Sequence, residues 1–331
     1  MTWTRPAEWE PHARTIMCWP ARRRVWGLGL PGVRADLARL ARVIARYEPV
    51  TMLAGPAQLG RAQRLCGPEV SVLPIPVDDL WARDTCPTFV TGPSGLSGVD
   101  FHFNGWGGKQ VHREDALVAQ RLLAADGLPR IPAPIVAEGG SLEVDGEGTL
   151  LATESSLVND NRNPGRGRAE IEDALKLTLG VRKVIWVPGV RGLDITDCHI
   201  DALARFAGPG VVLLDRPADG ARPDVWSRAA EQAAEVLRGS TDAAGRPLTV
   251  VDLPAADPGR RGKDFLPSYT NFALVNGAVI MPRFGDPAAD DRAAGILREL
   301  HPGREVVAVE IDTLAEGGGG IHCATQHQPV G

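Results

Sequence analysis

The apolar residues of this chain form short runs that recur about every 50 to 70 residues, which indicates an internal repeat. Each run is typical of a strand, and a polar, often acidic loop follows it. A second strand comes next, often with a glycine turn and a third strand after it. The copy at the N-terminus is the most degenerate, as expected where a circular array closes. The leading runs of the other copies are VSVLPIPV, PIVAEGG, KVIWVPGV, LTVVDLP and EVVAVEI.

Segments with helix-like apolar spacing separate these strand clusters. They cover residues 33–47, 115–126, 168–179, 225–238 and 291–301. Each unit is therefore a strand, a loop, two strands and a helix, and five such units predict an α/β protein that closes on itself. The length of 331 residues suggests about two domains. Because no Ser/Gly linker interrupts the pattern, we instead expect residues 1–331 to form a single domain.

Composition and charge narrow the class of protein. The chain is 44% hydrophobic and 23% charged, which is an ordinary globular balance and argues against a disordered or membrane protein. Its net charge is −5 and its arginines are spread along the chain, so it has no basic patch for nucleic acid. The N-terminus lacks the apolar segment of a signal peptide. The chain contains no C-x-x-C pair, so its sequence does not indicate a zinc ribbon. Its scattered cysteines favour a reducing cytoplasm; they are Cys18, Cys66, Cys86, Cys198 and Cys323.

The loops after the leading strands occupy equivalent places in the five units. In a closed array these loops would converge on one mouth. Several carboxylates, a histidine and a cysteine from distant segments would then meet near the axis. The polar residues of these loops are Asp79, Asp84, Glu138, Asp197, His199, Asp201, residues 268–271 and Cys323.

Cys323 follows four consecutive glycines, residues 317–320, in the segment GGGGIHCATQ. Glycines permit a close backbone approach to a ligand, which suits a nucleophilic cysteine. A buried cysteine can also be a small core residue beside an ordinary loop. Both interpretations stay open on these residues alone.

His199 lies between Asp197 and Asp201 in DITDCHID. In an extended segment both aspartates share its side, where a carboxylate raises the pKa of a histidine and orients it for proton transfer. A structural histidine is the alternative. A metal site built with Asp201 and His322 is weaker, because no H-x-x-x-H pair supports it.

Asp84 and Glu138 lie beside Pro or Gly, where acidic residues often serve only in turns. Burying several acids together is costly unless a cation neutralises them. A guanidinium offers five donors in a planar fork that matches paired carboxylates. The acidic loops therefore favour a small cationic ligand of the guanidine class.

Seven segments together resemble the agmatine deiminase and bacterial peptidylarginine deiminase family of guanidine-modifying enzymes. They run from about Arg5 to Pro329, nearly the whole chain. The segments are RPAEWEPHARTIMCWP, DDLWARDTCPTFV, FNGWGGK, EGGSLEVDGEGTLLATESSLVNDNRNPG, DITDCHIDALARF, SYTNFALVNGAVIMPRFGD and GGGGIHCATQHQP.

The resemblance implies a pentein fold, a five-bladed α/β-propeller of ββαβ units with pseudo-fivefold symmetry. It implies a hydrolase that uses no metal or organic cofactor, and it suggests a homodimer. From the composition and the cysteines we expect a cytoplasmic protein that contacts neither nucleic acid nor membrane. The reaction converts agmatine to N-carbamoylputrescine and ammonia through a covalent amidino-thioether on the cysteine.

Residue by residue, the resemblance makes Cys323 the nucleophile and His199 the general acid and base. Asp84 and Asp201 hold the guanidinium, and Glu138 supports His199 and the substrate. Trp81 packs against the aliphatic part of agmatine. Asp79, Asp197 and Gly320 are further candidates for substrate binding.

The chain departs from the family at three positions beside the site. Cys86 and Cys198 replace glycines, and Gly320 replaces an asparagine. A cysteine in place of glycine would strain the backbone wherever φ is positive. These departures leave a different guanidine substrate open, such as peptidyl-arginine or a specialised metabolite. An amidinotransferase with the same Cys/His site, or a cation-binding protein without catalysis, would be further alternatives.

Overall fold

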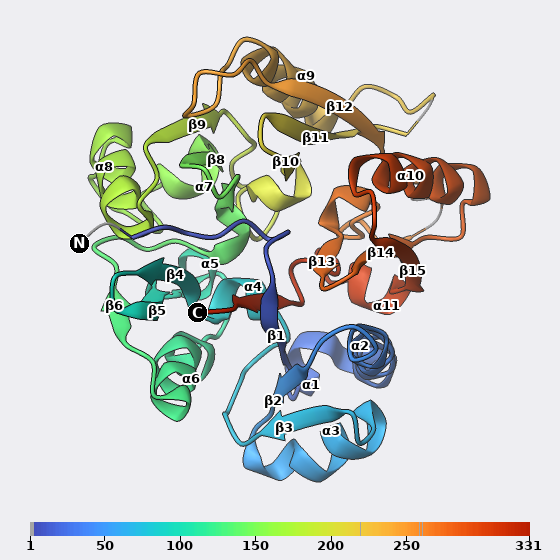
Figure 1. Ribbon diagram of the computed structural model, residues 1–331. Helices are drawn as coiled ribbons and strands as arrows, with labels where there is room; N and C mark the ends of the chain where they lie inside the picture. Colours follow the sequence, from blue (N-terminus) through green and yellow to red (C-terminus); the bar gives the residue numbers. More distant parts are fainter. Residues whose placement is uncertain (1–2, 219, 258, 260) are drawn as a thin grey trace.

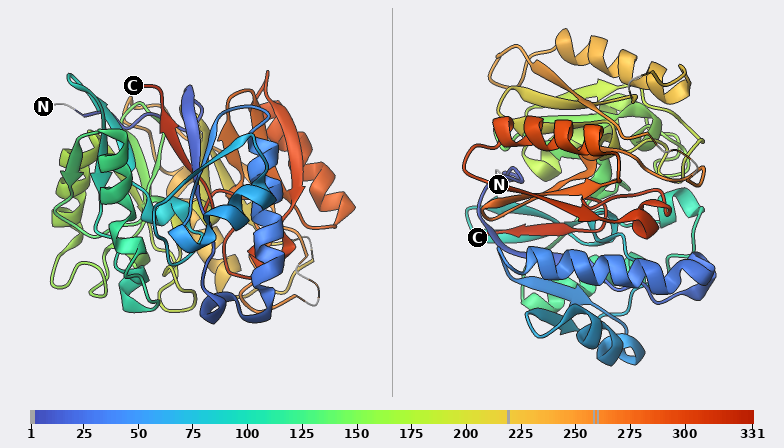
Figure 2. Two further views of the ribbon diagram at one scale, coloured as in Figure 1. Left: turned by 90° about the horizontal axis from the view of Figure 1, so that it is seen from below. Right: turned by 90° about the vertical axis from the view of Figure 1, so that its right-hand side faces the viewer.

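The computed structural model describes residues 3–218, 220–257, 259 and 261–331. Within these residues the strands form five small sheets around a common axis, and the long helices lie outside them (Figure 1). Helix α2 (Leu30–Ile44) is seen end-on in Figure 1 and lengthwise in the right-hand view of Figure 2, so it runs along the axis.

Four of the five sheets in the described residues repeat one plan. An antiparallel hairpin is followed by a crossover helix and by a third strand that pairs in parallel with the second hairpin strand. Their strands are β4 (Thr88–Gly92), β5 (Gly95–Asp100) and β6 (Arg130–Pro132); β7 (Glu143–Val144), β8 (Thr149–Thr153) and β9 (Lys183–Val187); β10 (Ala204–Gly208), β11 (Val211–Arg216) and β12 (Thr249–Pro254); and β13 (Ala273–Val275), β14 (Ala278–Arg283) and β15 (Glu305–Glu310).

The remaining sheet joins the two ends of the chain. Its order is β16 (Gln326–Pro329), β1 (His12–Cys18), β2 (Val50–Leu53) and β3 (Val70–Leu73). Strands β16 and β1 are antiparallel, whereas β1, β2 and β3 are parallel. In Figure 1 β16 and β1 lie next to each other near the centre. The pairing closes the ring, as the degenerate N-terminal copy predicts.

The predicted closed array of five units is confirmed, but the unit boundaries move. The four leading runs that contain a strand pair with the preceding sheet, because a parallel crossover through a helix returns the chain to the sheet it left. One leading run was wrong as a strand: in PIVAEGG the backbone is irregular, and the nearby strand β6 lies just before it.

The predicted outer helices are all present. They are α2, α6 (Val118–Asp126, preceded by the 3-10 turn η3, Asp115–Leu117), α8 (Arg168–Leu179), α9 (Val225–Arg238) and α10 (Pro287–Leu300). Helix α3 (Leu59–Cys66) was not predicted. The apolar face of each outer helix packs against a sheet. In α8, for example, Ile171 and Leu175 belong to the same core cluster as Leu150 and Trp186 of the sheet. The shorter elements are α1 (Arg23–Trp26), α5 (Gly105–Gly108), α7 (Glu154–Leu157), α11 (Asp312–Ala315), η1 (Gly27–Gly29) and η2 (Pro56–Gln58).

Each hairpin begins with a short helical turn at the same place in its unit. The turns are α4 (Ala82–Thr85) before β4, η4 (Gly139–Ser141) before β7, η5 (Ile200–Ala202) before β10, η6 (Tyr269–Asn271) before β13, and residues 321–324 before β16. Successive turns pack against one another. The residues predicted to meet at the mouth lie in these turns or next to them.

The two cysteines in glycine positions differ in backbone conformation. Cys198 has φ of 68° and Asp197 before it has φ of 60°, so both are left-handed. Cys86 has φ of −76° and ψ of 161°, an ordinary extended conformation. The expected strain is therefore present at Cys198 and absent at Cys86.

Glycine and alanine variants should report this difference. At position 198 we expect Cys198→Gly to be more stable than Cys198→Ala by about 1 kcal/mol, because alanine keeps the left-handed strain. At position 86 we expect the reverse order, because glycine there only adds freedom to the unfolded chain. Thermal unfolding midpoints of the four variants test this, and the same order at both positions would contradict it.

Candidate active site

The structure brings together the five residues predicted to be catalytic. Asp84 lies in α4, Glu138 just before η4, His199 and Asp201 at η5, and Cys323 in the turn before β16. All except Cys323 are buried, and Cys323 is half-buried. The convergence that the repeat pattern predicted is thus present.

The Cys323 thiol lies between an amide and a carboxylate. Its Sγ is 3.2 Å from the Asn271 Nδ2 donor and 3.6 Å from Asp201 Oδ2. Asn271 Oδ1 also accepts from the Cys323 backbone N–H at 3.2 Å. Burial, with the charges of Asp201 and Asp84, raises the pKa of the thiol well above its usual value. In the absence of a cation the residue is therefore a thiol.

His199 faces two carboxylates across the site from the thiol. Its Nδ1 is 3.7 Å from Asp84 Oδ1 and its Nε2 is 3.4 Å from Glu138 Oε2. Burial would lower the pKa of His199, but Asp84, Glu138 and Asp201 raise it to about 9. The imidazole is therefore protonated at neutral pH and can donate a proton.

Asp84 is held by neutral donors. Gly140 N–H donates to its Oδ1 and the Trp106 indole to its Oδ2, each at 2.9 Å. Burial raises the pKa of Asp84, because among the described residues only His199 at 3.7 Å brings a positive charge near it. A cation placed against Asp84 would remove this penalty.

Glu138 is paired with a buried arginine. Arg162 Nε lies 2.7 Å from Glu138 Oε1 and 3.0 Å from its Oε2, and Arg162 Nη1 lies 2.7 Å from Asp197 Oδ2. Burial alone would raise the pKa of Glu138, but Arg162 and then His199 lower it overall. Glu138 therefore stays ionised beside His199.

Two buried polar atoms of the site lack a hydrogen-bond partner among the described residues, and they are Asp201 Oδ1 and His199 Nε2. Buried polar groups are nearly always satisfied, so such atoms in a cleft point to a ligand. Gly140 lies beside the same residues, since a Cβ there would lie 2.6 Å from His199 Nδ1 and 3.0 Å from both Asp201 Oδ2 and Asp84 Oδ1. The space next to Gly140 is therefore flanked by an imidazole and two carboxylates.

Trp81 forms one wall next to the glycine run. A Cβ on Gly319 would lie 2.3 Å from Trp81 Cζ3, and one on Gly317 would lie 2.3 Å from Trp26 Cη2. The two indole rings are 6.1 Å apart. Only glycines let the backbone approach these rings so closely.

Three further candidates for substrate binding contact protein groups. Asp79 accepts from Trp26 Nε1 at 2.7 Å and from Gln110 Nε2 at 3.0 Å. Asp197 Oδ2 accepts from Lys109, Asn161 and Arg162, with the ion pair to Lys109 at 2.6 Å. Gly320 packs against Asn271, where a Cβ would lie 2.6 Å from Oδ1. Asp197 reaches Glu138 through Arg162, and Gly320 reaches Cys323 through Asn271.

Sequence reasoning missed three residues that contact this cluster. Trp106 and Arg162 lie within the segments FNGWGGK and NDNRNPG, yet nothing in their spacing shows that they reach Asp84 and Glu138. Asn271 was grouped with the polar mouth without a role of its own. The repeat pattern predicts which loops meet, and it does not predict which side chains touch.

The described part of the chain contains no group of three His, Cys, Asp or Glu side chains arranged to hold a metal ion. No helix there has the length and apolar character needed to cross a membrane.

A closed ring of five ββαβ units with a Cys, a His and three carboxylates at its axis defines a guanidine-modifying type of protein. The chain belongs to the Porphyromonas-type peptidyl-arginine deiminase family, whose model matches residues 4–329.

Relatives and solved structures agree over the full length. The chain is 41% identical to an agmatine deiminase of Pseudomonas fluorescens, covering 98% of this chain and 95% of the relative. It is 38% identical to an agmatine deiminase of Medicago truncatula, covering 98% and 96%. The structure of the agmatine deiminase of Enterococcus faecalis superposes with a TM-score of 0.92 at 32% identity, covering 99% and 96%.

Removing the buried cation at Arg162 should be strongly destabilising. In Arg162→Met both Glu138 and Asp197 lose a buried partner, and breaking a buried ion pair costs about 3–5 kcal/mol. The matched control is Arg168→Met, where an exposed pair with Glu154 is lost and we expect less than about 1 kcal/mol. Denaturant unfolding of both variants measures this, and equal losses would contradict the analysis.

Proposed function

We propose that this protein hydrolyses the guanidinium group of agmatine to give N-carbamoylputrescine and ammonia. The observation that carries the proposal is the buried space flanked by Asp84, Asp201 and His199. Cys323 Sγ lies 3.6 Å from Asp201 Oδ2, and Asp201 Oδ1 has no partner among the described residues. The agmatine deiminases among its full-length relatives support the choice of substrate. The expected homodimer and cytoplasmic location stay predictions.

The carboxylates bind and orient the cation. A guanidinium between Asp84 and Asp201 satisfies the free oxygen of Asp201 and supplies the positive charge that Asp84 lacks. The same charge lowers the pKa of the Cys323 thiol, which loses its proton to solvent. Binding the substrate thus produces the thiolate nucleophile.

The first half of the reaction releases ammonia. The thiolate attacks the guanidinium carbon and forms a C–S bond, giving a tetrahedral intermediate. Protonated His199 donates its proton to a departing amino group, the C–N bond breaks, and ammonia leaves. An amidino-thioether cation remains on Cys323, and the carboxylates stabilise its charge.

The second half consumes water. His199 is now neutral and takes a proton from a water molecule that attacks the same carbon. Collapse of this intermediate breaks the C–S bond and forms the ureido carbonyl. The remaining proton returns to the thiol, and His199 is protonated again as at the start. Glu138 lies beside His199 and favours its protonated form in both halves.

The first test is ammonia release from agmatine by the wild type and by Cys323→Ala, with mass spectrometry of the ureido product. We expect turnover by the wild type and a loss of at least about 10³-fold in the variant, because the covalent route needs the thiol. Turnover of arginine or a blocked arginine peptide but not of agmatine would change the substrate. An amidine transferred to an added amine would indicate an amidinotransferase, and binding without turnover would contradict enzyme function.

The contact between the glycine run and Trp81 has a kinetic test. In Gly319→Ala the new methyl group must displace the Trp81 ring, which we propose packs on the aliphatic chain of agmatine. We expect KM to rise about tenfold, equivalent to about 1.4 kcal/mol of lost contact. Gly295→Ala in α10 is the control, because its Cβ meets nothing within 4 Å. An unchanged KM in Gly319→Ala would remove Trp81 from substrate binding.

A further inference from the structure

His322, the residue before the proposed nucleophile, lies between two buried carboxylates. Its Nδ1 is 2.7 Å from Asp201 Oδ2 and its Nε2 is 2.8 Å from Glu8 Oε2. The ring is 1% exposed, so water does not offer an alternative partner. A neutral imidazole has only one N–H to donate, whereas an imidazolium donates to both carboxylates. The geometry is that of a cation held between two anions.

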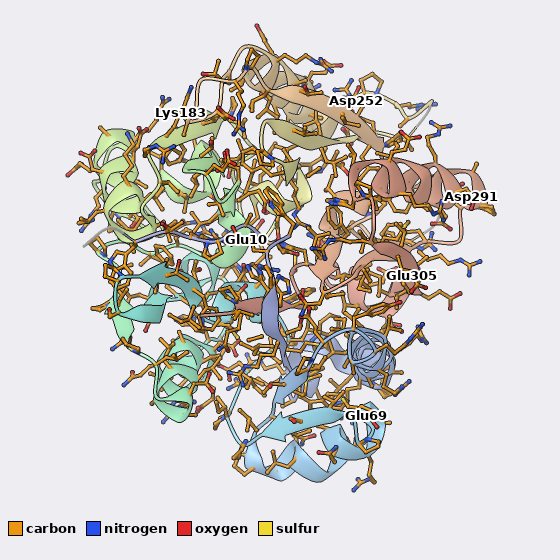
Figure 3. All side chains as sticks on the ribbon, in the orientation of Figure 1. Glu10, Glu69, Lys183, Asp252, Asp291 and Glu305 are labelled. Atoms are coloured by element: carbon orange, nitrogen blue, oxygen red, sulfur yellow. The ribbon has the colours of Figure 1, made fainter. Side chains whose placement is uncertain are left out.

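Glu8 is held in place by three different units of the ring. Its Oε1 accepts from the Leu274 N–H at 2.8 Å, and its Oε2 lies 3.0 Å from Arg205 Nη2 and 3.3 Å from Arg83 Nη2. These contacts lower the pKa of Glu8 well below its usual value against the opposing effect of burial. The N-terminal segment that carries Glu8 crosses the centre of the ring, where Figure 3 labels its neighbour Glu10. Glu8 is therefore a fixed anchor.

The bond to His322 leaves one oxygen of Asp201 for a ligand. Asp201 Oδ2 accepts a hydrogen bond from His322 Nδ1 and lies 3.6 Å from Cys323 Sγ, while Oδ1 has no partner in the part of the chain that is described. A carboxylate rotates freely unless a donor fixes one of its oxygens. His322 supplies that donor and, in the same contact, a positive charge.

We propose that His322 is a positioning residue, anchored by Glu8, that keeps Asp201 ionised and directs its free oxygen toward the guanidinium. This inference rests on the proposed function for the identity of the cation. It assigns the buried centre of the ring a part in binding that none of the predicted site residues covers.

The charged groups around Asp201 set the sign of the expected pH effect. His322, His199 and Arg205 face it as cations, and Asp84 and the Cys323 thiol face it from the other side. Burial raises the pKa of Asp201, but the His322 bond and charge, followed by His199 and Arg205, lower it overall. Without the His322 cation, the pKa of Asp201 rises. Asp201 then becomes protonated, and unable to hold the guanidinium, at a higher pH.

The test is the pH profile of kcat/KM for agmatine in His322→Gln. We expect its acid limb to move up by about 1 pH unit or more, since one nearby opposite charge shifts a carboxyl pKa by about that amount. At a pH on that limb kcat/KM falls about tenfold, mainly through KM. Glu8→Gln weakens the anchor and should move the limb in the same direction by less. It also serves as the test variant if His322→Gln fails to fold.

His327→Gln is the matched control. His327 belongs to the same buried centre, 3.8 Å from Glu8 Oε2 and 3.1 Å from Arg83 Nη1, and among the described residues it makes no hydrogen bond or ion pair with Asp201. The acid limb of the kcat/KM profile of His327→Gln should stay at the wild-type position. Folded His322→Gln and Glu8→Gln with the wild-type limb, or an equal shift in His327→Gln, would overturn the proposal.

A second readout does not depend on turnover. Iodoacetamide alkylation of Cys323, followed by peptide mass spectrometry, reports the pH at which this thiol ionises. In His322→Gln the midpoint should rise, because a cation beside the Asp201–Cys323 pair is lost, and in His327→Gln it should not move. If the wild type turns over no guanidine, the proposed function fails, while this midpoint still decides the role of His322.

Discussion

The burial of negative charge at the axis is the constraint on which the rest of this structure depends. Asp84, Glu138, Asp201 and Glu8 are all withdrawn from water, and isolated buried carboxylates are very unfavourable. Three of them have a cationic partner within the protein: Arg162 for Glu138, His322 for Asp201, and Arg205 for Glu8. Asp84 instead has two neutral donors and a distant imidazole, so its charge is the least compensated. The site is thus short of one positive charge, and a guanidinium supplies it.

This shortage connects binding to chemistry. With the cation absent, the surrounding anions hold the thiol protonated and the imidazole charged, which is an inactive combination for nucleophilic attack. The substrate cation acts on Cys323 more than on His199, because it lies against the thiol that attacks it. His199 therefore keeps the proton that the leaving group needs. The carboxylates of Asp84 and Asp201, which disfavour the free thiolate, bind and orient the guanidinium once the substrate is present.

Sequence reasoning reached the fold and the catalytic cluster because both are consequences of periodicity. Five repeats of strand, loop, hairpin and helix require a ring, and equivalent loops in a ring meet at its axis. The same reasoning could not separate acids that face a ligand from acids that cap a turn. Nothing in DITDCHID distinguishes Asp197 from Asp201, yet the Asp197 carboxylate forms ion pairs with Lys109 and Arg162. His322 entered only as a weak metal ligand, because its partner Glu8 is more than three hundred residues away in sequence. Contacts between units do not recur at a fixed spacing, so no local sequence pattern predicts them.

Ring closure and assembly of the site are one event in this molecule. Cys323 and His322 precede β16, and Glu8 precedes β1, so the pairing of these two strands places the nucleophile, the cation and its anchor together. Neither chain end carries a complete set of partners, since Glu8 also needs Arg83, Arg205 and the Leu274 N–H from other units of the ring. A partly open ring would leave Glu8 and His322 as unpaired charges and would free the oxygen of Asp201 that His322 holds. The closed ring is therefore stabilised by the same ionic contacts that hold Asp201 beside the thiol.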